Sequence, residues 1–269
     1  MEEARVIVHT EFGGGYRRIV FDAPGIAAIA APGQFVHIRI PQLSQEALRR
    51  PFSIYRSKGR ELQVMYKPVG RGTHVMEHAV VGDVYSLLGP LGRGFPVDRA
   101  GIFPVCVAGG YGVAPLSFLA EKLECPGVVF IGGRKAQDIL CTEDFAGLGW
   151  DVRVATEDGS VGEKGLVTEA FDRWVAARAP GAMAPEIYAC GPERLMHVLT
   201  ERAARHGWQA WLSLDRPMGC GIGACLACVQ RVRDANGKQH WARCCTEGPV
   251  FDSKELVWEA ADLKKASTN

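Results

Sequence analysis

The cysteines near the end of the chain have the spacing of an iron–sulfur ligand set. Cys220, Cys225 and Cys228 form a C-x4-C-x2-C run, and Cys245 follows after sixteen intervening residues. Three thiolates from one short loop and a fourth from a distant segment can enclose a [2Fe–2S] cluster in the plant-type ferredoxin arrangement. Glycines at positions 219, 221 and 223 permit positive φ angles and bring backbone N–H groups close to sulfur. The run therefore predicts a cluster-binding loop.

Two other interpretations of these thiols compete with the cluster. A structural zinc site also uses four cysteines, but it usually pairs two short knuckles, whereas this chain has one triple and a lone distant partner. A disulfide framework is the weakest interpretation, because the nine cysteines are odd in number and the first four are scattered through apolar segments. Free thiols are typical of a reducing compartment, so we expect a cytoplasmic protein.

Length and composition limit the classes of protein to consider. The 269 residues predict two or three domains, and the 47% apolar and 23% charged fractions are ordinary for a globular chain. A net charge of +1 argues against a nucleic-acid or membrane surface. The acidic first residues do not form a signal peptide, and no apolar run approaches the roughly 18 residues needed to cross a bilayer.

The secondary structure predicted for the chain differs between its three parts. Residues 1–98 contain short alternating segments at 5–10, 16–21, 34–40, 52–55 and 62–66, separated by glycine and proline, which predict an antiparallel β-barrel with one helix at 72–80. Residues 99–207 alternate buried strands (103–108, 128–131, 152–155, 186–189) with helices (116–123, 166–177, 193–206). This alternation predicts an α/β domain with a parallel sheet. Residues 208–269 form a small cluster domain.

Two barrel segments have the chemistry of a flavin site. Arg50-Pro51-Phe52-Ser53 begins a predicted strand, where a guanidinium can bind a pyrophosphate and a hydroxyl can reach a flavin ring nitrogen. The segment Met65-Tyr66-Lys67 leads to Gly72 and Thr73, where a predicted helix offers N–H groups to a phosphate. Each segment alone could be an ordinary strand or a glycine turn with a threonine cap.

Two loops of the α/β domain lie where open sheets bind nucleotides, at the carboxyl ends of strands. Gly109, Gly110 and Gly112 follow the first buried strand, and Cys190-Gly191-Pro192 follows the last. Neither loop has the G-x-G-x-x-G pattern of the standard dinucleotide fold, and either one could be structural. Two such loops in one small sheet favour a dinucleotide site. The seven histidines show no metal-ligand spacing apart from a pair at i and i+4, so we expect them to be ordinary surface or core residues.

These motifs, in this order, resemble the ferredoxin-reductase superfamily, in which R-x-[YF]-S-[IL] and G-x-[GA]-T bind flavin while G-G-x-G-[IV]-[AT]-P and C-G-P bind the nicotinamide dinucleotide. The C-terminal segments 218–225 and 245–251 resemble the electron-transfer subunits of dihydroorotate dehydrogenase B, so the resemblance covers essentially the whole chain. It selects Cys245 rather than Cys244 as the fourth ligand. Phe52 replaces a frequent tyrosine, and Asp215-Arg216-Pro217 departs from the usual acidic pair.

The resemblance implies a function that the residues alone do not give. It implies an oxidoreductase subunit holding FAD and a [2Fe–2S] cluster and using NAD(H) as co-substrate, in a heterotetramer with an FMN-containing dihydroorotate dehydrogenase catalytic subunit of pyrimidine biosynthesis. We find no catalytic base for the dihydropyrimidine in this chain, and we expect the partner to dock near residues 216–230. The resemblance implies a preference for NAD(H) over NADP(H), although the basic pair Arg134-Lys135 could bind a 2′-phosphate or could equally be a solvated helix start. The alternatives are a related NAD(P)H–ferredoxin reductase, a sulfhydrogenase γ-type subunit, or a zinc-binding adaptor with an inactive reductase fold.

Overall fold

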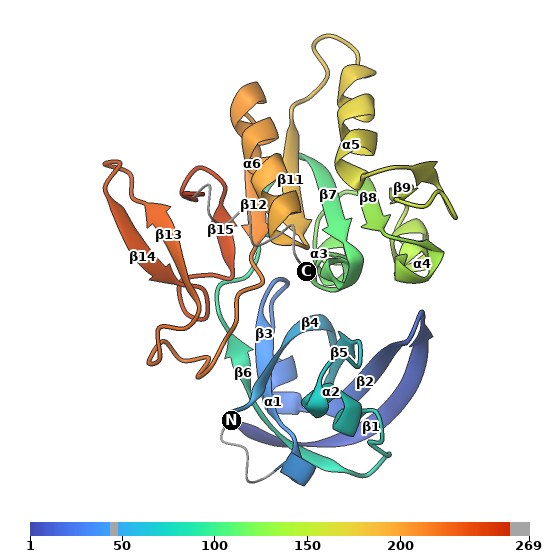
Figure 1. Cartoon of the computed structure of the whole chain (residues 1–269), viewed down its shortest axis with the longest axis vertical. Helices are drawn as coiled ribbons and strands as arrows, with labels where there is room; N and C mark the ends of the chain where they lie inside the picture. The colour runs from blue at the N-terminus through green and yellow to red at the C-terminus, as the bar shows by residue number, and fades with distance from the viewer. Residues whose placement is uncertain (44–47, 259–269) are drawn as a thin grey trace.

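The N-terminal part of the chain is a closed antiparallel barrel, which confirms the predicted β-domain (Figure 1). The computed structural model describes residues 1–43 and 48–258. The strands close in the order β1-β2-β5-β4-β3-β6. Their bounds are β1 Glu2–Gly13, β2 Tyr16–Asp22, β3 Phe35–Arg39, β4 Arg50–Lys58, β5 Glu61–Tyr66 and β6 Val84–Leu91, with short helices α1 Pro24–Ala27 and α2 Arg71–Met76 and a 3-10 turn η1 Pro41–Leu43.

Two details of this barrel differ from the sequence expectation. The helix predicted at 72–80 ends at Met76, because the chain then turns: the carboxylate of Asp83 accepts a hydrogen bond of 3.0 Å from the Val80 N–H. Strand β6 was not predicted, since Gly89 and Pro90 interrupt its apolar pattern. It nevertheless pairs with both β1 and β3 and closes the barrel.

The second part is a mainly parallel sheet with helices on both faces. The strand order is β10-β9-β8-β7-β11-β12-β15, and only β15 is antiparallel to its neighbour. Residues of helices α5 and α6 share a buried cluster with Val105 and Val107, while α3 and α4 pack with Cys106 and Ala108 on the other face. The strands are β7 Phe103–Gly109, β8 Val128–Gly133, β9 Asp151–Thr156, β10 Glu163–Lys164, β11 Pro185–Cys190, β12 Gln209–Ser213 and β15 Val250–Asp252; the helices are α3 Val113–Ala120, α4 Thr142–Gly147, α5 Val167–Ala176 and α6 Glu193–His206, with 3-10 turns η2 Gly110–Gly112 and η3 Ala136–Asp138.

Several boundaries in this sheet also correct the expectation. Helix α3 begins at Val113, directly after the glycine loop, and ends at Ala120 rather than running from 116 to 123. Helix α4 was not predicted, because its six residues are too short to show a helical period. Among the described helices, none combines the length and apolar character that crossing a bilayer would require.

The cysteine-rich part of the chain is built onto the edge of the parallel sheet. Strands β12 and β15, one before and one after the cysteine loop, pair with each other and extend the sheet beyond β11. Between them lie the loop that carries Cys220, Cys225 and Cys228 and a separate hairpin of β13 Val229–Arg233 and β14 Gln239–Arg243. The cysteine loop therefore begins after β12 of the parallel sheet and ends at β13 of the hairpin.

Direct contacts fix the barrel against the parallel sheet. Phe118 of α3 is buried in the core of the barrel. The hydroxyl of Tyr55, on β4, donates to Oδ2 of Asp144 on α4 at 2.5 Å. The neighbouring Arg56 pairs with Glu121 at the end of α3. Strand β4, which carries the Arg50–Ser53 motif, is thus held by both helices that cover this face of the sheet.

Candidate cofactor sites

The four predicted cluster ligands lie in two pairs. The backbone N–H of Cys225 donates to Sγ of Cys220 at 3.4 Å, and the N–H of Cys220 donates to Sγ of Cys225 at 3.4 Å. In the second pair the N–H of Cys245 donates to Sγ of Cys228 at 3.4 Å. Within the described residues, no three His, Cys, Asp or Glu side chains gather as ligands of a single metal ion. Two pairs of cysteines are compatible with the two irons of a [2Fe–2S] cluster.

Backbone donors of the loop favour the thiolate form of Cys220, the form that metal binding requires. Backbone N–H groups, first that of Ile222 and then those of Cys225 and Ala224, lower the pKa of Cys220 to about 6. The Ala224 N–H lies 3.2 Å from Cys220 Sγ. Positive φ angles at Gly221 and Gly223 curl the backbone so that these donors face inward. Donors fixed around sulfur are the protein's means of tuning an iron–sulfur centre, so the loop fits the group.

Cys244 and Cys245 have different surroundings although they are adjacent. Both are buried, but only Cys245 directs its backbone N–H at the sulfur of Cys228. The Cys244 N–H donates instead to the Cys228 carbonyl at 3.0 Å. Burial raises the pKa of Cys244 to about 12, while burial and the neighbouring Cys228 thiol raise the pKa of Cys245 to about 11. The geometry favours Cys245 as the fourth ligand.

The two flavin motifs meet at one end of the barrel. A Cβ added at Gly72, in the first turn of α2, would lie 2.9 Å from Ile40 Cδ1 and 3.2 Å from the Arg50 guanidinium nitrogen Nε, so glycine lets the helix start lie close to Arg50. Thr73 closes the turn, since its hydroxyl oxygen accepts hydrogen bonds from the N–H groups of Val69 and Gly70 at 2.9 and 3.1 Å. Ser53 is exposed on β4 and is open to a ligand.

The remaining predicted flavin residues divide between the two sides of the barrel wall. Phe52 packs against the barrel core, with its ring in edge contact with buried Tyr66 at 5.9 Å. Because successive strand residues face opposite sides, Pro51 and Ser53 face outward. Met65 is buried against the parallel-sheet domain. Lys67 Nζ lies 3.6 Å from Oδ1 of Asp138, a residue that the sequence did not single out.

The two predicted nucleotide loops are brought into direct contact at the carboxyl edge of the sheet. Strands β7 and β11 are parallel neighbours, so their following loops emerge side by side. A Cβ at Gly112 would lie 2.2 Å from the Cys190 carbonyl oxygen, and one at Gly109 would lie 2.6 Å from Pro192 Cδ. A Cβ at Gly191 would lie 2.9 Å from the backbone nitrogen of Gly109. Burial, followed by Asp215, raises the pKa of the Cys190 thiol to about 12.

Sequence reasoning missed the contacts that join the three parts. The hydroxyl of Tyr111, in the glycine loop, donates to Asp215 Oδ2 at 2.7 Å, just before the cysteine loop. Arg216 donates to Glu193 Oε1 at 2.8 Å, at the start of α6, and also contacts Gln230. Asp215 and Arg216, which depart from the family pattern, therefore connect the nucleotide loops to the cysteine loop. Tyr111 and Glu193, the residues that they contact, lie far from them in the sequence, so no local pattern predicts these contacts.

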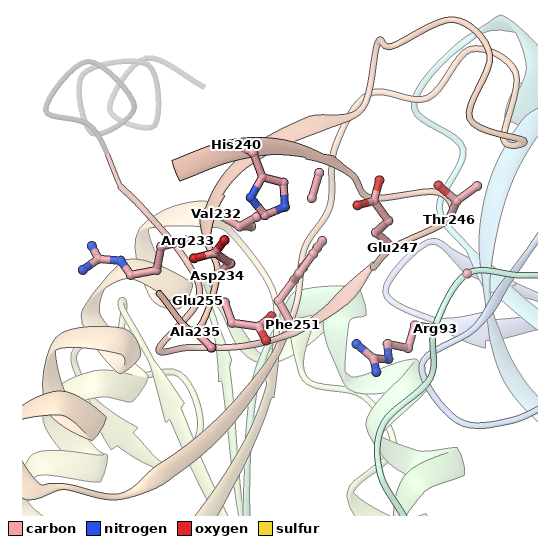
Figure 2. A pocket seen from close by; sticks show the side chains of 12 residues that line it. Arg93, Val232, Arg233, Asp234, Ala235, His240, Thr246, Glu247, Phe251 and Glu255 are labelled. Carbon is pink, nitrogen blue, oxygen red and sulfur yellow. The ribbon is translucent and has the colours of Figure 1, made fainter. Parts of the chain in front are cut away.

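A cavity of about 550 Å³ lies between the β13–β14 hairpin and the segment after the barrel (Figure 2). Its lining mixes charges of both signs, including Arg93, His240, Glu247 and Glu255. Burial raises the pKa of Glu255. Thr246, Glu247 and Phe251 of this lining belong to the segment 245–251 that begins at the predicted ligand Cys245, so the cavity borders the cluster motif. None of the lining residues belongs to the predicted flavin or nucleotide motifs.

Comparison with known proteins gives consistent results at several levels. The family model for the iron–sulfur cluster binding domain of dihydroorotate dehydrogenase B matches residues 215–257. The dihydroorotate dehydrogenase B (NAD(+)) electron transfer subunit of Desulforamulus reducens is 41% identical over 245 residues, covering 89% of this chain and 91% of the relative. The subunit of the same name from Bacillus cereus strain Q1 is 36% identical over 259 residues, covering 94% and 96%.

Solved structures share the architecture. A chain of the NADH-dependent reduced ferredoxin–NADP oxidoreductase, studied for flavin-based electron bifurcation, superposes with a TM-score of 0.83 at 26% identity and covers 100% of this chain and 94% of that one. The ferredoxin reductase of carbazole 1,9a-dioxygenase superposes with a TM-score of 0.64 at 23% identity over 77% of this chain and 65% of that one. The second likeness concerns the fold only.

Proposed function

We infer the function of this chain from its membership of a family: it belongs to the dihydroorotate dehydrogenase B electron transfer subunits. It is an oxidoreductase subunit that works with FAD, an iron–sulfur cluster and NAD, in pyrimidine biosynthesis. Its relatives are named as electron transfer subunits, which implies that this chain acts with a catalytic partner subunit. Its task is to carry electrons between that partner and NAD⁺.

The observation that carries this function is the joining of three cofactor sites by one rigid framework. Strand β4 with the flavin motif is tied to α3 and α4, and the nucleotide loop is tied through Tyr111 to the segment before the cysteine loop. When bound, FAD exchanges electrons in pairs with a nicotinamide and singly with an iron–sulfur cluster. The chain's own residues would hold these groups and would keep the cluster thiols in a peptide-lined loop.

We assign FAD to the outward face of β4 and the start of α2. Arg50 would bind the pyrophosphate, Ser53 would hydrogen-bond the ring, and Gly72-Thr73 would leave room for phosphate. The close approach of Gly72 to the Arg50 guanidinium supports this assignment, because it places a fixed cation at a helix start. Pro51, Phe52, Met65, Tyr66 and Lys67 would shape the surrounding wall.

Substituting Arg50→Ala is expected to weaken FAD retention. Loss of a charge-assisted contact costs about 1.5–3 kcal/mol, equivalent to roughly ten- to a hundredfold in affinity. FAD content after dialysis, measured by absorbance, tests this. Arg60→Ala is the matched control, since Arg60 is an exposed barrel arginine paired with Asp22. Equal FAD content in the two variants would remove Arg50 from the site.

The dinucleotide would lie over Gly109, Gly110, Gly112 and the Cys190-Gly191-Pro192 loop. The tight packing of these loops at the ends of β7 and β11 supports this proposal. Arg134, which could have attracted a 2′-phosphate, lies 3.3 Å from the carboxylate of Asp138. This partial neutralisation favours NAD(H), and the preference over NADP(H) stays a prediction.

We propose that the partner is an FMN-containing dihydroorotate dehydrogenase catalytic subunit, in an assembly of two copies of each chain. The cysteine loop is the natural docking surface, because electrons from the partner would enter this chain through the cluster. Ile222 and Leu226 support this, since their apolar side chains are 58% and 60% exposed between the cluster ligands.

All nine cysteines are free thiols, which supports the proposed cytoplasmic location.

Substituting Leu226→Glu is expected to weaken binding of the catalytic subunit about tenfold or more, because a buried charge replaces an apolar contact. Titration of the purified holo-subunit with its partner measures this, and the visible spectrum reports that the cluster remains. Val69→Glu is the control, since Val69 is 78% exposed on the barrel. An unchanged affinity for Leu226→Glu would move the interface elsewhere.

A related reductase acting with a different partner is the second candidate. The whole-chain superposition on the NADH-dependent reduced ferredoxin–NADP oxidoreductase favours it. The sequence identity is lower, at 26% against 41% for the electron transfer subunit from Desulforamulus reducens. The two candidates share the cofactor sites, so identification of the chain that co-purifies with this one separates them.

A further inference from the structure

A buried histidine lies between the barrel and the cysteine loop. His37, on β3, has no exposed surface. A Cβ built on Gly221 would lie 2.9 to 3.0 Å from three atoms of its ring, Cε1, Nδ1 and Nε2. Three nearly equal distances place the Gly221 Cα against the face of the imidazole. Gly221 is the residue directly after the proposed cluster ligand Cys220, so a barrel side chain touches the backbone of the cluster loop.

The same side chain belongs to the proposed flavin face. His37 is paired across β3 and β4 with Pro51, and Phe35 is paired with Ser53. Val36 and Ile38 point into the barrel core, so Phe35 and His37 point outward with Pro51 and Ser53. The rings of Phe35 and His37 lie 5.7 Å apart. One strand thus connects the wall assigned to FAD with the loop assigned to the cluster.

Hydrogen bonding does not explain why an imidazole occupies this position. Both ring nitrogens are buried and have no hydrogen-bond partner among the described residues. Burial, followed by the charge of Arg49, lowers the pKa of His37 to about 4, so the ring is uncharged at neutral pH. A contact that the described residues make with this side chain is the packing of Gly221 on the flat face of the ring.

We propose that His37 is a positioning residue that seats the cysteine loop on the flavin-bearing face of the barrel and so sets the separation between the two cofactors. The inference rests on the proposed function and adds a residue that the motifs do not contain. Gly221 must remain without a side chain, both because its φ is +74° and because the imidazole occupies the space of a Cβ.

A double-mutant cycle between His37 and Gly221 tests this contact. In the holo-subunit, stopped-flow absorbance after mixing with NADH gives the rate of cluster reduction relative to flavin reduction. Gly221→Ala forces the loop off the ring and is expected to lower this ratio. Adding His37→Ala removes the clash and is expected to restore the ratio at least about threefold, which exceeds the usual error of additivity. His37→Ala alone, which leaves a void under the loop, is expected to lower the ratio as well.

Gly223→Ala is the matched control for backbone strain. Gly223 lies in the same loop with φ +83°, but its added Cβ would meet Thr246 at 3.2 Å rather than His37. His37→Ala should therefore give no rescue of Gly223→Ala, and the two single effects on the ratio should add. Equal rescue of both alanine variants, or no rescue of Gly221→Ala, would overturn the proposal.

The iron-to-FAD ratio keeps the test decisive if Gly221→Ala loses its cluster. Recovery of iron in the double variant supports the contact, and continued loss contradicts it. Failure of the proposed function is distinguishable, because the unmodified chain would then lack FAD or iron altogether.

Discussion

Serine in place of Cys245 is expected to abolish the [2Fe–2S] cluster, whereas serine in place of Cys244 is expected to keep it. The two residues are adjacent, but only the Cys245 backbone N–H reaches the sulfur of Cys228, at 3.4 Å. The thiols form the pairs Cys220–Cys225 and Cys228–Cys245, which fits two irons with two ligands each. Iron content and the EPR signal of the dithionite-reduced protein measure the result.

The remaining cysteines give this experiment its controls. Cys220→Ser, Cys225→Ser and Cys228→Ser should each behave like Cys245→Ser, with near-complete loss of iron. Cys125→Ser should retain the cluster, because Cys125 lies elsewhere and its thiol contacts the Ile102 carbonyl. Loss of the cluster in Cys244→Ser together with its retention in Cys245→Ser would reverse the ligand assignment. FAD content should be unaffected in all six variants.

The sequence predicted those features that local patterns encode. The barrel was visible because alternating residues must face a core and solvent in turn, and β7 was visible because a strand covered on both faces is apolar throughout. The cofactor motifs could be predicted because the glycine, arginine and cysteine residues that would bind a cofactor lie close together within short segments. Gly112 against Cys190 shows why glycine is needed at such a loop, because a Cβ there would collide with the backbone of a neighbouring segment.

Features that depend on distant segments were not predictable. Strand β6 has a glycine and a proline in its pattern, yet it is held because β1 and β3 offer two unpaired edges. The sequence placed the residues of strand β12 in the predicted cluster domain, but this strand pairs with β11 and extends the parallel sheet. His37 was expected to be ordinary, and its contact with Gly221 joins residues far apart in the sequence.

The isolated chain is expected to reduce ferricyanide or dyes with NADH but to show no oxidation of dihydroorotate by NAD⁺. Removing hydrogen from a dihydropyrimidine requires a positioned base and a flavin beside the substrate. The motifs of this chain supply one flavin site, one dinucleotide site and one cluster, which suffice for electron transfer only. The proposed FMN-containing partner would supply the base and the second flavin, so activity with dihydroorotate should depend wholly on complex formation.

The most direct test of the account is dihydroorotate-dependent reduction of NAD⁺, followed by NADH absorbance, after coexpression with the dihydroorotate dehydrogenase catalytic chain of the same genome. We predict a stable complex with this activity, none for either chain assayed separately, and loss of the activity in the complex carrying Cys245→Ser. A complex that fails to form, an active isolated chain, or full activity without the cluster would contradict the proposed role.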